Sequence, residues 1–175
     1  MPSDAFYVRP ARTTDVPAVE RLVDAYAEQR ILLAKERVTL YEDVQEFRVA
    51  IAEPAAPGEP NEMIGCGALH VMWEDLAEIR TVAVAPEWRG RGVGGRILEA
   101  LIEQARAVGV GRLFCLTFEV GFFGRYGFRE IAGTPVSPEV FAELVRSMDE
   151  GVAEFLDLAR VKPNTLGNSR MIRLL

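Results

Sequence analysis

The sequence is poor in the residues that build metal sites, disulfides and membrane spans. Its 175 residues include one histidine and two cysteines, and both Cys66 and Cys115 lie inside apolar runs. Without a cluster of cysteine and histidine, the sequence predicts no metal site. The two cysteines are expected to be buried free thiols, as in a reducing cytoplasm. No apolar run approaches the roughly 20 residues that cross a bilayer. Residues 1–7 also lack the basic segment and apolar core of a signal peptide, so a cytoplasmic location is expected.

Positive charge is also in deficit. Lysine and arginine number 20 against 26 aspartate and glutamate, which gives a net charge of −6. This balance argues against nucleic acid as a partner, and it means that an anionic ligand must be held by local geometry. The hydrophobic content of 49% is typical of a globular protein, and no repeat or linker divides the sequence. Residues 1–175 are therefore predicted to form one domain with neither a nucleic-acid nor a membrane partner.

The most informative feature that is present is a glycine-rich turn between an apolar strand and a helix. An alternating apolar run stops at Pro86, and Arg89-Gly-Arg-Gly-Val-Gly94 precedes an amphipathic segment. Such a turn presents several unpaired backbone N–H groups to an anion, and its arginines add positive charge. It suits a pyrophosphate, although an ordinary strand-to-helix connection with solvated arginines is the alternative. The glycine spacing does not fit a dinucleotide-binding G-x-G-x-x-G motif, and the Gly-Lys-Ser/Thr of a Walker A loop is absent.

This turn resembles a known signature. Arg89-x-x-Gly92-x-Gly94 is similar to the acetyl-coenzyme A motif (Q/R)-x-x-G-x-(G/A) of the GCN5-related N-acetyltransferases, the GNAT family. The resemblance covers nearly the whole chain and implies acetyl-CoA as cosubstrate. It also implies an α/β fold in which a central mixed sheet, flanked by helices, has two parallel strands that splay apart around the coenzyme. The coenzyme-binding residues implied are Val82, Ala83, Val84, Arg89, Gly90, Arg91, Gly92, Val93, Gly94 and Gly95.

Hydrophobic periodicity predicts an order of elements that fits this fold. Strands are predicted at residues 6–9, 47–52, 63–72, 77–84, 112–118 and 169–175. The second and third should form an antiparallel hairpin around a turn at 54–60, and the strands 77–84 and 112–118 should be parallel. Helices are predicted to be capped by Thr14 and Thr39, to run from the glycine turn to Gly109 with Val108 on the buried face, and to cover most of 140–158 with Val145 and Met148 buried.

A finer resemblance concerns the acceptor. Segments around Lys35 and Leu40, Trp73–Arg80, Leu113–Thr117 and Asn168–Met171 are similar to N-acetylglutamate synthases. Those enzymes acetylate the α-amino group of glutamate at the start of arginine biosynthesis. The chain resembles their short, single-domain bacterial form, without an amino-acid-kinase domain. Those short forms often have arginine where Lys35 stands, and their C-terminal segment differs. The resemblance implies direct acetyl transfer to glutamate, or to a close congener such as glutamine.

An amino-acid acceptor requires a base, because its amine is protonated near neutral pH. Glu78 begins the first splayed strand and matches the glutamate proposed as base in the family. An exposed strand-end carboxylate is the alternative interpretation. Glu74 and Asp75 are nearby alternatives for the base.

The leaving thiolate requires a hydrogen-bond donor. Phe123 occupies the position of the tyrosine that many family members use, and it has no proton to give. The synthases share this loss and place serine or threonine at the end of the second splayed strand, which is Thr117 here. Thr117 is predicted to stabilise the thiolate, with a backbone-bonded hydroxyl as the alternative. Tyr126 or water could supply the proton instead.

Two acceptor carboxylates would call for cationic partners. By resemblance and placement, acceptor-binding residues are expected at Lys35, Arg80, Asn168, Ser169 and Arg170. Each charge could instead be a solvated surface group, and His70 is expected to be structural. Two other functions fit the coenzyme signature. One is acetylation of another small amine or of a protein amine. The other is a non-catalytic acetyl-CoA-binding module, which the missing tyrosine favours and the presence of Glu78 and Thr117 opposes. The apolar C-terminal region makes a homodimer plausible.

Overall fold

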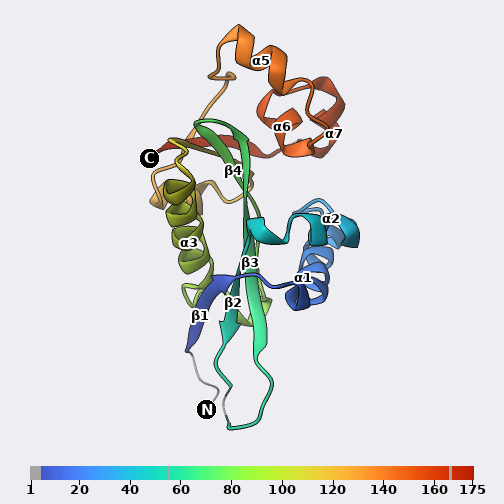
Figure 1. Cartoon of the computed structure of the whole chain (residues 1–175), viewed down its shortest axis with the longest axis vertical. Helices are drawn as coiled ribbons and strands as arrows, with labels where there is room; N and C mark the ends of the chain where they lie inside the picture. Colours follow the sequence, from blue (N-terminus) through green and yellow to red (C-terminus); the bar gives the residue numbers. More distant parts are fainter. Residues whose placement is uncertain (1–4, 55, 166) are drawn as a thin grey trace. The chain divides into compact units, whose positions relative to one another are not determined.

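The computed structural model describes residues 5–54, 56–165 and 167–175. Its strands are hydrogen bonded in the order β1-β2-β3-β4-β5-β7-β6, as a seven-stranded mixed sheet (Figure 1). The strands are β1 Phe6–Pro10, β2 Phe47–Ala52, β3 Glu62–Trp73, β4 Leu76–Val84, β5 Arg112–Thr117, β6 Arg129–Glu130 and β7 Ser169–Leu174. The helices are α1 Val16–Glu28, α2 Arg37–Glu42, α3 Val93–Val108, α4 Val120–Arg125, α5 Pro138–Leu144, α6 Glu150–Phe155 and α7 Lys162–Thr165.

The chain divides into two compact units, each assembled from separate stretches of sequence. The first takes in the chain up to Leu69 together with Thr81–Gln104, and the second takes in His70–Arg80 with Ala105–Leu175. Strands β3 and β4 contribute residues to both units. One domain over residues 1–175 stays a prediction.

In the first unit, β2 pairs antiparallel with both β1 and β3, so the predicted hairpin is confirmed. Helices α1 and α2 lie side by side in Figure 1. The buried face of α1 joins one hydrophobic cluster with β2, which includes Val16, Val19, Val23, Tyr26, Phe47, Val49 and Ile51. The alternation of apolar residues in β2 and their helical spacing in α1 place these side chains on facing surfaces.

The two predicted threonine caps are wrong. Thr14 lies inside a short 3₁₀ helix, Thr13–Asp15, and the N-cap of α1 is Asp15. The Asp15 carboxylate accepts the Arg12 N–H at 2.7 Å, which stabilises this extra turn before α1. The N-cap of α2 is Glu36, so Thr39 lies within the helix. Apolar periodicity does not fix the first residue of a helix, because local hydrogen bonds such as that of Asp15 decide where the helix begins.

Helix α3 packs closely on β3. A Cβ built on Gly65 or Gly67 would lie 2.8 Å from a side-chain carbon of Ile97. The absence of side chains at these two positions therefore allows the helix to approach the strand. As predicted, the helix ends at Gly109, whose φ of 99° suits glycine and whose N–H donates to the Ala105 carbonyl at 3.0 Å. Val108, predicted to be buried, is 57% exposed because it lies in the last turn.

In the second unit, β5 pairs parallel with β4 and antiparallel with β7, and β6 pairs with β7. The predicted parallel pair is therefore confirmed. Its register is short, from Leu76 opposite Arg112 to Glu78 opposite Phe114. A second hydrophobic cluster includes Phe114 and Phe155, whose ring centroids are 5.2 Å apart.

The predicted long helix over 140–158 consists of two short ones. Ser137 caps α5 by accepting the Val140 N–H, and Asp149 caps α6 by accepting the Val152 N–H. The chain between these helices leaves Val145 47% exposed and Met148 90% exposed, so both were wrongly predicted to be buried. Apolar spacing continues through this break, but the capping aspartate starts a new helix.

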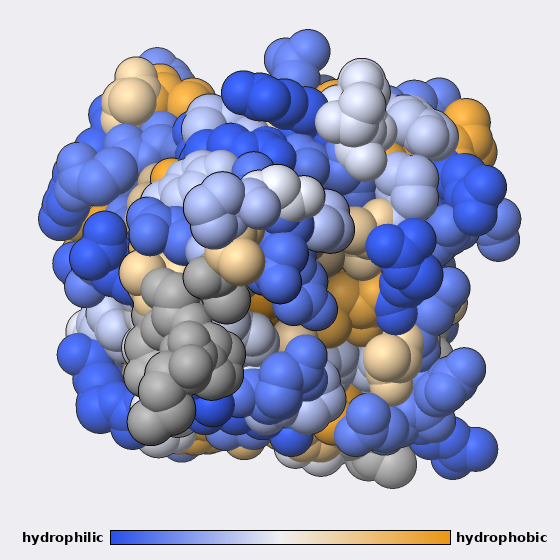
Figure 2. All heavy atoms as spheres, turned by 90° about the horizontal axis from the view of Figure 1, so that it is seen from below, coloured by the Kyte–Doolittle hydropathy of each residue, from blue (hydrophilic) through white to orange (hydrophobic). Residues whose placement is uncertain are grey.

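Cys66 and Cys115 are buried free thiols, as predicted. Burial raises the pKa of Cys66 to about 12 and also raises that of Cys115. On the face shown in Figure 2, hydrophilic residues cover most of the described surface, and hydrophobic residues show in small areas between them. Among the described residues, no helix combines the length and apolar composition that a membrane crossing requires.

Candidate active site

The glycine turn leads directly into α3. Gly90 and Gly92 have φ values of 75° and 82°, a region that glycine adopts at little cost. A Cβ built on either would meet no atom within 4 Å, so their backbone faces open space. The turn is therefore open to an approaching anion, beside the first N–H groups of a 16-residue helix. Val93 is buried, so only its backbone could take part in binding.

Arg89 is fixed through a tyrosine that the sequence did not link to the turn. The Tyr26 hydroxyl accepts hydrogen bonds from Arg89 Nε at 3.1 Å and Nη2 at 2.8 Å. It donates its own proton to the Val84 carbonyl at 2.5 Å. Tyr26 thereby links α1, the end of β4 and the arginine of the signature. The Arg91 guanidinium lies 5.2 Å from the centre of the Trp88 ring.

Strand β4 contains a backbone outlier. Thr81 is 7% exposed and has a φ of 58°, which is unusual for a β-branched residue. It separates Glu78 from Val82–Val84, the strand residues implied to bind coenzyme. Ala83 is buried in the first hydrophobic cluster, and Val84 already accepts the Tyr26 proton. Strained backbone is found preferentially at functional sites, which fits the expectation for this strand.

Glu78 is a buried carboxyl group, 3% exposed. The alternative of an exposed strand-end carboxylate is therefore wrong. Within the described part of the chain, its Oε2 atom is buried and accepts no hydrogen bond. Burial raises the pKa of Glu78 to about 8; Arg80 opposes the rise, Glu154 and Asp149 add to it, and His70 opposes it. A carboxyl group with this pKa is suited to accept a proton near neutral pH.

Arg80 bonds to an aspartate that the sequence analysis missed. Its Nη1 atom donates to both oxygens of Asp149, at 3.0 Å and 2.8 Å. His70 Nε2 lies 3.5 Å from Asp149 Oδ2, so this histidine takes part in a charged cluster. Burial pushes the pKa of Asp149 up, but the hydrogen bond and charge of Arg80 hold it below its usual value. These bonds favour a role for Arg80 within the protein, and acceptor binding by Arg80 stays a prediction.

Thr117 lies at the end of β5 and is 8% exposed. Its Oγ1 atom accepts the Glu119 N–H at 2.8 Å, as the backbone-bonded alternative required. Since the hydroxyl acts as acceptor there, its own proton remains available for donation. The predicted donor role is therefore compatible with this bond. Of the alternative bases, Asp75 forms an ion pair with Arg112 at 2.9 Å, and Glu74 is exposed.

The Arg170 guanidinium donates most of its hydrogen bonds to backbone carbonyls. It donates to the carbonyls of Glu154 at 3.3 Å and Gly133 at 3.0 Å, and also to that of Phe155. Three of the five N–H donors of a guanidinium are thus engaged, and burial lowers its pKa. Binding of an acceptor carboxylate stays a prediction for the donors that remain.

The other predicted acceptor residues have varied surroundings. Ser169 donates to the Glu130 carboxylate at 2.5 Å, and the Asn168 N–H donates to the Thr165 carbonyl at 3.1 Å. Lys35 lies in the first unit, in the segment between α1 and α2, and is partly exposed. Acceptor binding by these residues stays a prediction.

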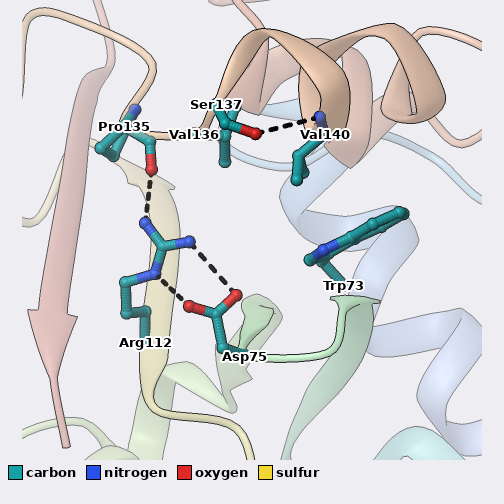
Figure 3. Close-up of a pocket in the computed structure, with 7 residues that line it drawn as sticks. All are labelled: Trp73, Asp75, Arg112, Pro135, Val136, Ser137 and Val140. Atoms are coloured by element: carbon teal, nitrogen blue, oxygen red, sulfur yellow. Dashed lines mark hydrogen bonds and ion pairs between the residues drawn. The ribbon is translucent and has the colours of Figure 1, made fainter.

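A cavity of about 420 Å³ lies elsewhere in the second unit (Figure 3). Figure 3 shows the Asp75–Arg112 ion pair on one side and the Trp73 ring on the other. The lining residues are Trp73, Asp75, Arg112, Pro135, Val136, Ser137 and Val140. Neither Glu78 nor Thr117 is among them, so the predicted catalytic residues do not line this cavity.

Comparison with known proteins identifies the family. The sequence profile of the acetyltransferase (GNAT) family matches residues 19–128. The chain is 58% identical to an amino-acid acetyltransferase of Mycobacterium tuberculosis over 168 residues, which cover 96% of this chain and 94% of that protein. The chain belongs to the acetyltransferase (GNAT) family. The predicted GNAT fold, acetyl-CoA as cosubstrate and acyltransferase class are thereby confirmed.

Solved structures agree with this membership. The GNAT chain superposes on Rv2747 from Mycobacterium tuberculosis, in complex with CoA and NLQ, with a TM-score of 0.90 and 58% identity over 97% of this chain and 99% of that one. It also matches N-acetylglutamate synthase from Neisseria gonorrhoeae, complexed with coenzyme A and N-acetyl-glutamate, with a TM-score of 0.72 and 25% identity. That match covers 98% of this chain and 35% of the longer protein. Within the described residues, no group of three or more His, Cys, Asp or Glu side chains could hold a metal ion.

Proposed function

We propose that this GNAT protein transfers the acetyl group of acetyl-CoA directly to the α-amino group of glutamate, or of a close congener such as glutamine. The observation that carries the proposal is the buried Glu78 carboxyl, whose pKa is raised to about 8. An amino-acid acceptor is supported by the comparison, because the chain is 58% identical to an amino-acid acetyltransferase over 96% of its length.

The glycine turn is the proposed coenzyme site. Arg89, Gly90, Arg91 and Gly92 would hold the pyrophosphate, together with the backbone N–H groups of Val93–Gly95. The open space at Gly90 and Gly92 fits a bulky anion. Val82–Val84 would bind the coenzyme through the backbone of β4. When bound, acetyl-CoA supplies the acetyl group as a reactive thioester.

The protein's own groups would then manage the proton and the charge. Glu78 takes a proton from the acceptor ammonium, which leaves a neutral amine able to attack. Thr117 donates a hydrogen bond toward the negative charge that develops on sulfur. The thiolate finally takes up a proton, and Tyr126 or water is the alternative to Thr117 as the source of that proton.

Lys35 and Arg170 are the proposed partners of the acceptor carboxylates, with Asn168 and Ser169 beside Arg170. We further propose that the product enters arginine biosynthesis, as its first acetylated intermediate, and that the enzyme acts in the cytoplasm. A homodimer is proposed from the apolar C-terminal region.

The test is a steady-state assay of thiol release from acetyl-CoA against a panel of acceptors. The panel contains glutamate, glutamine, other amino acids, simple amines and a lysine-containing peptide. We expect glutamate or glutamine to give the highest kcat/KM, with a stoichiometric N-acetyl product. Preferential turnover of the peptide or of simple amines would refute the amino-acid assignment. Tight acetyl-CoA binding with no turnover of any acceptor would indicate a non-catalytic module.

A further inference from the structure

The Glu78 carboxylate packs against the first turn of α6. Gly151, the second residue of that helix, is buried. A Cβ built on Gly151 would lie 1.9 Å from Glu78 Oε2 and 2.8 Å from the carboxyl carbon. The carboxylate therefore occupies the space that any larger residue at position 151 would fill.

Asp149, the N-cap of the same helix, reaches Glu78 through Arg80. Arg80 Nη1 lies 2.8 Å from Asp149 Oδ2 and 3.6 Å from Glu78 Oε2. Asp149 Oδ1 also accepts the Val152 N–H at 3.0 Å, which ties the aspartate to the helix. One nitrogen of Arg80 thus stands between two carboxylates and makes its shorter contacts with Asp149. This arrangement limits how far the guanidinium can neutralise Glu78.

We propose that the turn Asp149–Gly151 is a positioning element for Glu78. Gly151 leaves the space in which the carboxylate lies, and Asp149 holds Arg80 beside Glu78 without letting the two form a close ion pair. Both residues act through Glu78 and touch no reacting atom. The proposal rests on the proposed function of Glu78 as the base.

Charged and titratable groups face Glu78 from several elements. They are Arg80 on β4, His70 on β3, Asp149 and Glu154 at α6, and the Cys115 thiol on β5. Within this set, Asp149 both adds negative charge and restrains the neighbouring cation. Replacing it by a neutral isostere should let Arg80 turn toward Glu78 and favour the ionised carboxylate.

The first test is Asp149→Asn, which keeps an oxygen to cap α6 but removes the charge. We expect the acidic limb of the kcat/KM profile to move to lower pH by about one unit, a modest shift for the loss of one neighbouring charge. Ser137→Ala is the matched control, because it removes the cap of α5 in the same unit and Ser137 is not among the groups that shift the pKa of Glu78. The control should lower stability without moving the profile. An Asp149→Asn profile that coincides with wild type would overturn the role of Asp149.

The second test is Gly151→Ala. The clash falls on the far end of the Glu78 side chain rather than on backbone, and alanine is the better helix former, so the fold should persist. We expect kcat to fall at least tenfold, because the carboxylate must move. Glu78→Asp shortens the side chain and so relieves the clash. The fall in kcat that Glu78→Asp causes should therefore be smaller in the Gly151→Ala background than in the wild-type background. Wild-type kcat in Gly151→Ala, or independent effects of the two changes, would overturn the role of Gly151.

A direct titration separates this proposal from the proposed function. The Glu78 carboxyl signal is followed by ¹³C NMR in wild type and Asp149→Asn, and is assigned by its loss in Glu78→Gln. If wild type acetylates no amino acid but Asp149→Asn still lowers the pKa of Glu78, the proposed function fails and the positioning of Glu78 stands. If the pKa does not move, Asp149 does not position Glu78, whatever the enzyme acetylates.

Discussion

Glu78 is the residue whose chemistry depends most on its surroundings. Its pKa is raised to about 8, mainly by burial, so the group is protonated at a pH where exposed carboxyls are ionised. A base acts in its deprotonated form, and wild-type kcat/KM should therefore rise with pH up to about 8. Glu78→Gln removes the proton acceptor, and we expect kcat to fall by about 10²–10⁴-fold.

The pH dependence distinguishes this loss from a general defect. The activity of Glu78→Gln should approach that of wild type at high pH, where more of the acceptor binds as the free amine. Profiles of kcat/KM from pH 6 to 10 measure this. Glu74→Gln is the matched control, since Glu74 is exposed on the neighbouring β3–β4 turn and should behave as wild type. A Glu78→Gln profile parallel to wild type at all pH values would refute the role of Glu78.

Lys35 is the residue on which the choice of acceptor depends in our proposal. An ammonium group favours a carboxylate over a neutral amide, because the charge-assisted hydrogen bond is the stronger one. Lys35→Met should raise KM for glutamate by about ten- to a hundredfold, the loss of roughly 1.5–3 kcal/mol. Acetyl-CoA binding should stay unchanged, and any preference for glutamate over glutamine should narrow.

Initial rates with both acceptors measure the effect. Lys162→Met supplies the control, because Lys162 pairs with Asp157 at the protein surface. Unchanged KM values and an unchanged glutamate-to-glutamine ratio in Lys35→Met would show that Lys35 is an ordinary surface lysine.

At the scale of elements, the turn before α3 gives the sharpest prediction. Gly92→Asp places a negative side chain where the pyrophosphate is proposed to bind, and we expect acetyl-CoA binding to be lost in a folded protein. Gly58→Asp is a matched control: Gly58 also has a positive φ, 92°, and a Cβ there would likewise meet no atom within 4 Å. Both changes should cost about 1 kcal/mol of stability through backbone strain. Calorimetry that finds equal acetyl-CoA affinity in the two variants would place the coenzyme elsewhere.

Regular periodicity made most of the elements predictable. The apolar run of β2 and the helical apolar spacing of α3 both come from local burial, so the sequence carries them clearly. The helix break before α6 was missed for a physical reason. Leu144 and Val152 are both buried across that break, which continues the apolar pattern while Asp149 begins a new helix.

The site was predictable only in part. Arg89, Gly92 and Glu78 belong to one continuous stretch of sequence, which is why they could be predicted together. The burial of Glu78 and its raised pKa became visible only in the structure. Tyr26, Asp149 and Gly151 come from distant parts of the chain. Tyr26 is separated from Arg89 by 63 residues and Asp149 from Arg80 by 69, and no spacing rule connects such pairs.

At the scale of the whole molecule, Glu78 links stability to pH. The folded protein holds the Glu78 proton up to about pH 8, whereas the unfolded chain releases it near the ordinary value of 4.5. Between these values the folded state binds more protons, so the contribution of Glu78 to the free energy of unfolding falls as pH rises. Glu78→Gln lacks this dependence. Its stability relative to wild type should therefore increase from pH 5 to 8 and then level off.

Urea denaturation of both proteins at pH 5, 7 and 9 measures this difference. The other ionisable groups are shared, so their contributions largely cancel in the comparison. A constant difference in the free energy of unfolding across the three pH values would show that Glu78 titrates normally in the folded protein.

The two buried cysteines have a practical consequence for enzymology. Reagents that detect free coenzyme A react with thiolates, and Cys66 and Cys115 are 0% and 1% exposed, with pKa values raised by burial. The native enzyme should therefore give almost no background colour with a disulfide reagent, even at high enzyme concentration. Unfolding exposes both thiols, so the same reagent reports the fraction of unfolded protein in every variant preparation. One cuvette can then measure turnover and check folding, which is the control that the glycine substitutions most need.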